Sequence, residues 1–142
     1  MASSVYNIAK LNLMNKVLDL ESATIKVALM DNSVAPVVTD VTYSTIAASY
    51  KELTTTGGYT VGGATLTTPA VSAVGNTAKF TGDAVSWGAT ASFTAYFAVL
   101  YDSAGIGATN NLICWIDFGG AQTVATGTFT ITWNASGIIV LS

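Results

Sequence analysis

The chain has 142 residues, of which 51% are hydrophobic and only 9% are charged, against roughly 25% charged residues in ordinary soluble domains. It contains five lysines, eight acidic residues and neither arginine nor histidine, so the formal net charge is −3. Nucleic-acid binding needs a cluster of basic residues, and an activated serine or cysteine nucleophile needs an imidazole nearby, so this composition argues against both. We expect no enzymatic activity, no cofactor, no metal ion and no nucleic-acid partner.

The N-terminal segment does not have the pattern of a secretory signal peptide, because asparagine and lysine residues interrupt its apolar residues. No apolar run in the sequence reaches the ~18 residues of a membrane-spanning helix, so we expect no membrane partner. Residues 1–5 are predicted to form a mobile arm. Residues 6–20 have a wide apolar stripe and predict an amphipathic helix of about four turns.

A strand is predicted over Thr24–Met30, and a long irregular segment, residues 31–50, follows it. We call this segment the excursion, and it contains at most a short helix near residues 43–48. Long connections of this kind are uncommon in compact domains and often bind partners. A short edge strand is predicted at residues 51–53.

The sequence GGYTVGG at residues 57–63 has glycine pairs, but it lacks the strand-then-helix setting and the lysine of a phosphate-binding loop. We interpret these glycines as turn or bulge residues around a short strand. Residues 64–74 and 77–81 predict two strands that Gly75 and Asn76 join in a hairpin.

Two runs, Ser92–Asp102 and Leu112–Phe118, are apolar at both alternating sets of positions. Strands of this kind are covered on both faces, so we place them in the middle of a packed β structure. The loop between them, residues 103–111, is rich in Gly, Ser and Asn. Cys114 lies inside the second run, where we expect a small core residue and not a reactive thiol.

Gly119 and Gly120 are predicted to end this strand, and further strands follow at residues 123–133 and 138–141. The chain as a whole, residues 1–142, is predicted to be a single mostly β domain: an antiparallel β-sandwich or barrel-like domain with one N-terminal amphipathic helix. Its predicted core consists of Phe93, Phe97, Val99, Leu100, Ile113, Trp115, Ile116, Phe129, Ile131 and Trp133.

Two kinds of site remain formally open among the carboxylates. A pair could act in glycoside hydrolysis, and calcium could bind near Asp31 and Asn32 or near Asp102, although no spacing matches a dedicated loop. Most of these carboxylates lie at predicted turns, where Asp commonly bonds to backbone amides. Asp117 lies among apolar residues near a strand end, and we expect a turn role there as well.

Several motifs together carry a family resemblance: the GGY turn, the pair SW that precedes FTAYFAVLYD, and the run from IDFGG to GTFTITWN. From about Tyr6 onward the chain resembles the small virion structural proteins of tailed bacteriophages. The resemblance implies a decoration or cement protein that binds the outside of the capsid shell, commonly as a homotrimer. Its implied partners are the major capsid protein and further copies of itself. Its implied location is the capsid surface of the virion, after synthesis in the host cytoplasm.

Two other functions stay open at this stage. One is a tail or head-fibre component of the virion, and the other is a β-sandwich module that binds a carbohydrate or host surface through exposed tyrosines. We predict that contacts to partners come from the N-terminal residues, the excursion and the loop of residues 103–111. The predicted contact residues are Val5, Tyr6, Val34, Pro36, Val38, Tyr43, Ile46, Tyr50, Ile106 and Asn110.

Overall fold

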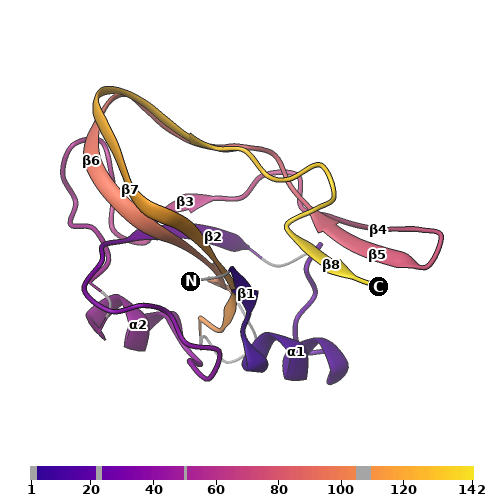
Figure 1. The fold of residues 1–142 in the computed structure, drawn as a ribbon. Helices are drawn as coiled ribbons and strands as arrows, with labels where there is room; N and C mark the ends of the chain where they lie inside the picture. Colours follow the sequence, from indigo (N-terminus) through magenta and orange to yellow (C-terminus); the bar gives the residue numbers. More distant parts are fainter. Residues whose placement is uncertain (1–2, 22–23, 50, 105–109) are drawn as a thin grey trace.

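The computed structural model of the chain describes residues 3–21, 24–49, 51–104 and 110–142. These residues form a mostly β structure with two antiparallel sheets and two short helices (Figure 1). No helix in these ranges is long and apolar enough to cross a bilayer.

The larger sheet contains five strands in the order β1-β7-β6-β2-β3, and every neighbouring pair is antiparallel. In this order the strands are β1 (Ser4–Val5), β7 (Leu112–Ile131), β6 (Val85–Asp102), β2 (Ile25–Met30) and β3 (Ala64–Thr65). The prediction that the two apolar runs lie in the middle is confirmed, because β6 and β7 are both interior strands. The sheet is open and does not close into a barrel.

Strand β7 is longer than predicted, because it continues through Gly119 and Gly120 to Ile131. The partner of Phe97 on β6 is Asp117, whereas the partner of Ala95 is Gln122, so residues 118–121 form a bulge opposite Tyr96. Gly119 has a φ of 74°, which favours glycine. The glycine pair therefore bends β7 without ending it, and both strands of the β6–β7 hairpin bend sharply (Figure 1).

The smaller sheet has the order β4-β5-β8, with β4 (Ala70–Val74), β5 (Thr77–Thr81) and β8 (Ile139–Leu141). The predicted turn at Gly75 and Asn76 is confirmed, since Val74 pairs with Thr77. Every residue of β4 is exposed, and the hairpin extends away from the rest of the molecule (Figure 1).

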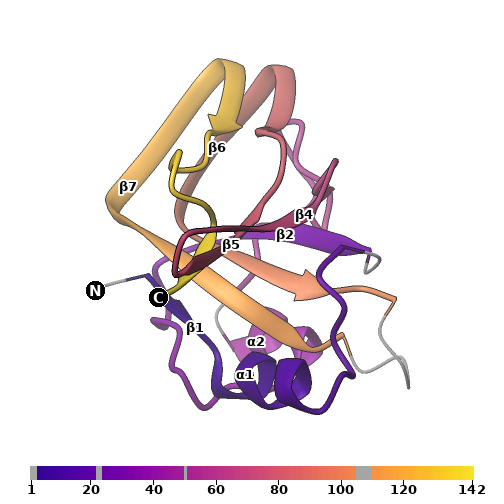
Figure 2. The same ribbon diagram turned by 90° about the vertical axis from the view of Figure 1, so that its right-hand side faces the viewer.

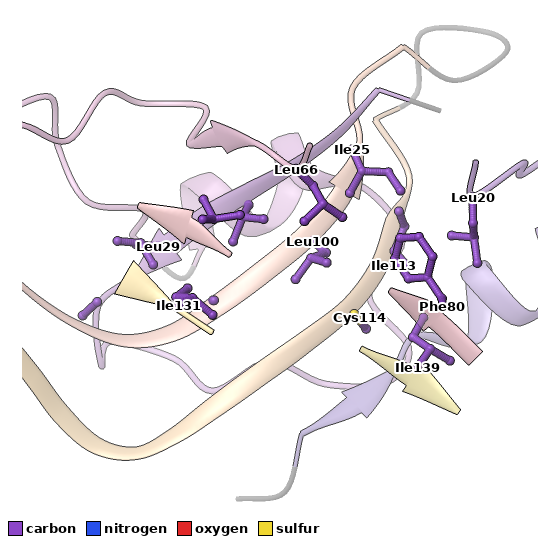
Figure 3. Close-up of a cluster of buried hydrophobic side chains, with 14 of the residues drawn as sticks. Leu20, Ile25, Leu29, Leu66, Phe80, Leu100, Ile113, Cys114, Ile131 and Ile139 are labelled. Carbon is purple, nitrogen blue, oxygen red and sulfur yellow. The ribbon is translucent and has the colours of Figure 1, made fainter. Parts of the chain in front are cut away.

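A buried apolar cluster joins the two sheets: Phe80 and Ile139 from the smaller sheet lie with Leu100 and Ile113 from the larger one (Figure 3). A second cluster, which includes Tyr6, Met30, Ile46 and Trp115, lies under the excursion. Six predicted core residues are buried, and they are Phe97, Val99, Leu100, Ile113, Trp115 and Ile131. The other four are half-buried and pack against the first cluster, and they are Phe93, Ile116, Phe129 and Trp133.

Cys114 is buried, as expected, and burial raises the pKa of its thiol to about 12. A thiol with such a pKa stays protonated at neutral pH, so it is a poor nucleophile.

The N-terminal region differs from the prediction in two respects. The helix α1 covers only Asn7–Met14, because Lys16 has a left-handed φ of 57° and the amides of Val17 and Leu18 bond back to the carbonyl of Asn12. The four-turn helix of residues 6–20 is therefore not confirmed. The prediction of a mobile arm at residues 1–5 is wrong for Ser4 and Val5, because these two residues form β1 and pair with β7.

Candidate functional site

The structure brings the predicted contact segments together around the excursion. The amide of Asn7 donates to the carbonyl of Val38 at 2.9 Å, which ties the excursion to the start of α1. The amide of Leu112 donates to the carbonyl of Val41 at 3.0 Å, and the amide of Tyr43 donates to the carbonyl of Asn110 at 2.9 Å. The N-terminus, the excursion and the start of β7 thus form one continuous region.

The ten predicted contact residues have different positions in this region. Tyr6, Pro36 and Ile46 are buried inside the chain itself. Because their side chains already pack in the core, we remove these three from the set of contact residues. The remaining described residues are exposed (Val34 and Val38) or half-buried (Val5, Tyr43 and Asn110). Tyr50 and Ile106 lie outside the described residues.

Val37 and Val41 are two further candidate contact residues that were not predicted from the sequence. Their side chains are 52% and 48% exposed. The carboxylate of Asp40 accepts a bond of 2.9 Å from the amide of Val37, and its own amide donates to the carbonyl of Val37 at 3.0 Å. This turn fixes the backbone at Val37, and the bond from the amide of Leu112 fixes it at Val41. We call Val34, Val37, Val38 and Val41 the valine segment.

The short helix predicted within the excursion is confirmed as α2 (Tyr43–Ser49). Its buried side chain, Ile46, packs in the cluster that contains Met30 and Trp115. The chain then returns to the sheet, where Met30 pairs with Glu52 and the amide of Leu53 donates to the carbonyl of Leu29 at 3.0 Å. The excursion is therefore held at both ends.

Glu52 is the centre of a hydrogen-bonded cluster that the sequence did not reveal. Its Oε1 accepts bonds from the hydroxyl of Tyr59 at 2.5 Å and from the amide of Gly62 at 2.7 Å. Its Oε2 accepts a bond from the hydroxyl of Tyr43. The partners come from α2 and from the GGYTVGG segment, so one carboxylate joins both segments to the sheet. We call Glu52, Tyr43, Tyr59 and Tyr101 the tyrosine–glutamate cluster.

The remaining contacts of the cluster fix the tyrosine rings. Tyr43 stacks on Tyr101 with ring centroids 3.9 Å apart and planes 8° from parallel. The Tyr101 hydroxyl donates to the carbonyl of Gly62 at 2.8 Å, and the Tyr59 hydroxyl accepts a bond of 3.0 Å from the amide of Leu29. Tyr59 is buried, so its ring is not accessible to a sugar, whereas Tyr43 is half-buried and stacks on Tyr101.

Burial and the neighbouring Glu52 carboxylate keep the phenols protonated. Burial raises the pKa of Tyr101 to about 12 and also raises the pKa values of Tyr43 and Tyr59. The hydrogen bonds to Glu52 raise the pKa values of Tyr43 and Tyr59 further, because the neutral phenol is the donor. The three hydroxyls are therefore stable donors at neutral pH.

An apolar groove of about 460 Å³ lies on another part of the molecule, between the segment after α1 and the smaller sheet. Its apolar lining includes Leu13 and Leu18 on one side and Val71, Phe80 and Leu141 on the other. Charged residues also line it, and they are Lys16, Asp19, Glu21 and Lys79.

Three of the carboxylates that were considered for chemistry have turn roles. Asp31, Asp102 and Asp117 each accept a bond from a backbone amide two residues further on, at 2.7, 3.0 and 2.8 Å. This is the turn geometry expected of Asp from the sequence. In the described part of the chain, no three His, Cys, Asp or Glu side chains lie where they could hold a metal ion.

Comparisons of this chain with protein-family models, with curated proteins and with solved structures gave no match.

Proposed function

We propose that this chain is a non-enzymatic structural protein of a tailed-phage virion, which binds the outside of the capsid shell and stabilises it. In this proposal its partner is the major capsid protein and it acts as a homotrimer. The two sheets serve as the halves of a β-sandwich, with α1 at one end. The proposal is founded on the sequence resemblance and is supported by the surface around the excursion.

The observation that carries the proposal is the valine segment on a firmly held excursion. Four valines at the surface within eight residues leave apolar area in contact with water, and burial of such area on a partner is worth about 25 cal/mol per Å². The tyrosine–glutamate cluster and the bonds to Asn7 and Leu112 hold the excursion in place before binding. A preformed contact segment loses little conformational freedom on binding, which favours affinity.

The low charge of the chain fits contact with a shell. A protein that bridges neighbouring capsid subunits adds interface area across junctions that the pressure of packaged DNA would otherwise separate. Uncharged hydroxyl and apolar side chains can make such contacts with little cost from unpaired charge. If the bridged site forms only when the shell expands, binding distinguishes an expanded shell from a precursor shell.

The test is co-sedimentation of the purified protein with expanded capsid shells. Deletion of the whole excursion would also remove buried Ile46 and cluster residue Tyr43, so surface variants are the sharper tool. We expect Val37→Asp with Val41→Asp to lose at least about tenfold in affinity, because two charges would have to be buried.

The matched control is Val61→Asp with Val74→Asp, which adds the same charges at valines that are 54% and 72% exposed elsewhere on the surface. This control should bind like the unmodified protein. Equal binding by both double variants would remove the valine segment from the contact surface, and no binding by the unmodified protein would contradict the proposed function.

A further inference from the structure

The outer edge of β7, the side away from β6, is open along most of its length. Strand β1 covers only Cys114 and Trp115, and the amide of Asp117 then donates to the hydroxyl of Ser3 at 3.1 Å. From residue 118 to residue 131, β6 is the one described strand that pairs with β7. In Figure 2 the upper part of β7 runs along the border of the molecule, with β6 on its inner side.

The corresponding edge of β6 is covered in the same region. The amide of Ser92 donates to the carbonyl of Gly57 at 2.8 Å. Gly57 lies so close to this strand that an added Cβ would be 2.0 Å from the carbonyl oxygen of Ser92. The GGY turn therefore closes one side of the hairpin, and the β7 side stays open.

The open edge lacks the residues that usually prevent strands from pairing between molecules. Native proteins protect edge strands with charged residues, especially lysine, and with proline. Asp117 is the last charged residue of the sequence, and residues 118–142 contain no proline either. Two bulges interrupt this edge, one at residues 118–121 and one at Thr126, which has a left-handed φ of 53° and no partner on β6, so residues 122–125 and 127–131 are the stretches available for pairing.

We infer that residues 122–131 of β7 pair, through their open edge, with an uncharged strand of a second copy of this chain. The side chains favour this partner. Thr123, Thr128 and Thr130 are exposed, and a hydroxyl both donates and accepts hydrogen bonds, so rows of hydroxyls from two copies satisfy each other. The β6–β7 hairpin already contains such pairs, Ser86 with Thr130 and Thr94 with Thr123, each at 2.8 Å. A charged partner strand would find no opposite charge here.

This inference rests on one part of the proposed function, the association of the chain with further copies of itself. It adds the strand edge through which the copies associate. The uncharged stretch of residues 118–142 includes two strands, β7 and β8. Pairing of β7 with β7 of the second copy gives a two-fold dimer, whereas pairing of β7 with β8 of the next copy gives a ring where the rotation between copies closes and a filament where it does not.

The first experiment measures the mass of the purified full chain in solution by light scattering during gel filtration. A mass of two or three chains agrees with the inference and distinguishes the dimer from the trimeric ring. The variant Ala125→Lys with Thr128→Lys places like charges on the open edge, so we expect it to be monomeric. The matched control, Ala89→Lys with Thr90→Lys, puts the same charges at exposed residues of β6 and should retain the mass of the unmodified protein.

A monomeric unmodified protein, or an edge variant that remains assembled, would overturn the inference. Hydrogen exchange of the unmodified protein gives a readout that does not depend on the variants. The amides of residues 122–131 that point away from β6 should exchange about tenfold or more slowly on assembly, because the ladder protects them. Fast exchange of these amides would overturn the inference even if the protein were oligomeric. Neither result affects binding to the shell through the valine segment, which the co-sedimentation assay measures separately.

Discussion

The hydroxyl of Tyr59 donates a hydrogen bond of 2.5 Å to Oε1 of Glu52, and the same carboxylate accepts a bond from Tyr43 in α2. One side chain thus connects the GGYTVGG segment, the excursion and the strand pairing at Met30. The contact surface that we propose depends on this connection, because the valine segment belongs to the excursion.

Removal of the carboxylate should destabilise the protein. Glu52→Ala leaves the hydroxyls of Tyr43 and Tyr59 and the amide of Gly62 without their acceptor, and we expect a loss of about 2–3 kcal/mol in the free energy of unfolding. Glu52→Gln retains an acceptor oxygen, so its free energy of unfolding should fall less than that of Glu52→Ala. Urea denaturation measures both variants, and Glu21→Ala, which removes one exposed bond to the amide of Val71, is the control. A Glu52→Ala protein as stable as this control would contradict the assigned role.

The glycine at residue 63 should not tolerate a side chain. A Cβ there would lie 2.0 Å from the carbonyl oxygen of Val27 and 2.8 Å from Cα of Ala28, so Gly63→Ala must displace β2. Gly75→Ala is the matched control: its φ of 61° is also left-handed, but an added Cβ meets no atom within 4 Å. We expect the control to cost about 1–2 kcal/mol and Gly63→Ala to cost clearly more. Equal thermal midpoints for the two variants would contradict the close packing at Gly63.

The central strand should be sensitive to loss of volume. Phe97 is buried on β6 in the cluster under the excursion, so Phe97→Ala should lower the free energy of unfolding by about 3–5 kcal/mol. Val74→Ala, at an exposed position of the β4–β5 hairpin, should change it little. Equilibrium denaturation compares the two, and a loss below about 1 kcal/mol for Phe97→Ala would indicate a peripheral position.

Stability should fall in alkaline solution. The tyrosines of the cluster have pKa values above the ordinary value of 10.0, and that of Tyr101 is about 12. The folded protein therefore holds these protons more tightly than the unfolded chain. The resulting stability is fully present below pH 10 and is lost as the pH rises through the folded pKa values.

The measurement is the urea midpoint between pH 8 and pH 12, together with the absorbance of tyrosinate. We expect the midpoint to fall from about pH 10 upward, and a Tyr43→Phe, Tyr101→Phe double variant to show a shallower fall. A urea midpoint that stays constant to pH 12 would contradict the role of the cluster in stability. A midpoint of the double variant that falls as steeply as that of the unmodified protein would also contradict it.

The thiol of Cys114 should react only after unfolding, because it is buried and its pKa is raised to about 12. A thiol reagent at pH 8 should label no cysteine in the native protein and one per chain in denaturant, since Cys114 is the single cysteine of the sequence. Rapid labelling of the native protein would place the second apolar run at the surface.

The sequence predicted the central strands well, because β6 and β7 are apolar at both alternating sets of positions where the sheet and the excursion cover them. It failed at Gly119 and Gly120, since a glycine pair predicts a turn, whereas here the neighbouring strand continues and the extra residues become a bulge. The first helix was predicted to be too long, because Leu18 and Leu20 fit a helical period in the sequence. In the structure their side chains pack in the core from an irregular segment.

The contact region was predicted in outline and not in detail. The excursion could be located from its length, but burial of Tyr6, Pro36 and Ile46 depends on how it folds back onto the sheet. The partners of Glu52 are 7 to 10 residues away along the chain and come from two segments, and no local pattern indicates that they converge. Val37 and Val41 had a signal in the sequence, because valines near Asp40 in an irregular segment have no strand to bury them.

Antibody labelling of intact virions, assembled from a genome that encodes this chain, tests the central claim most directly. We predict that electron microscopy will show label spread over the head. Label confined to the tail or to a single vertex would contradict the decoration function and would favour a tail or fibre component instead.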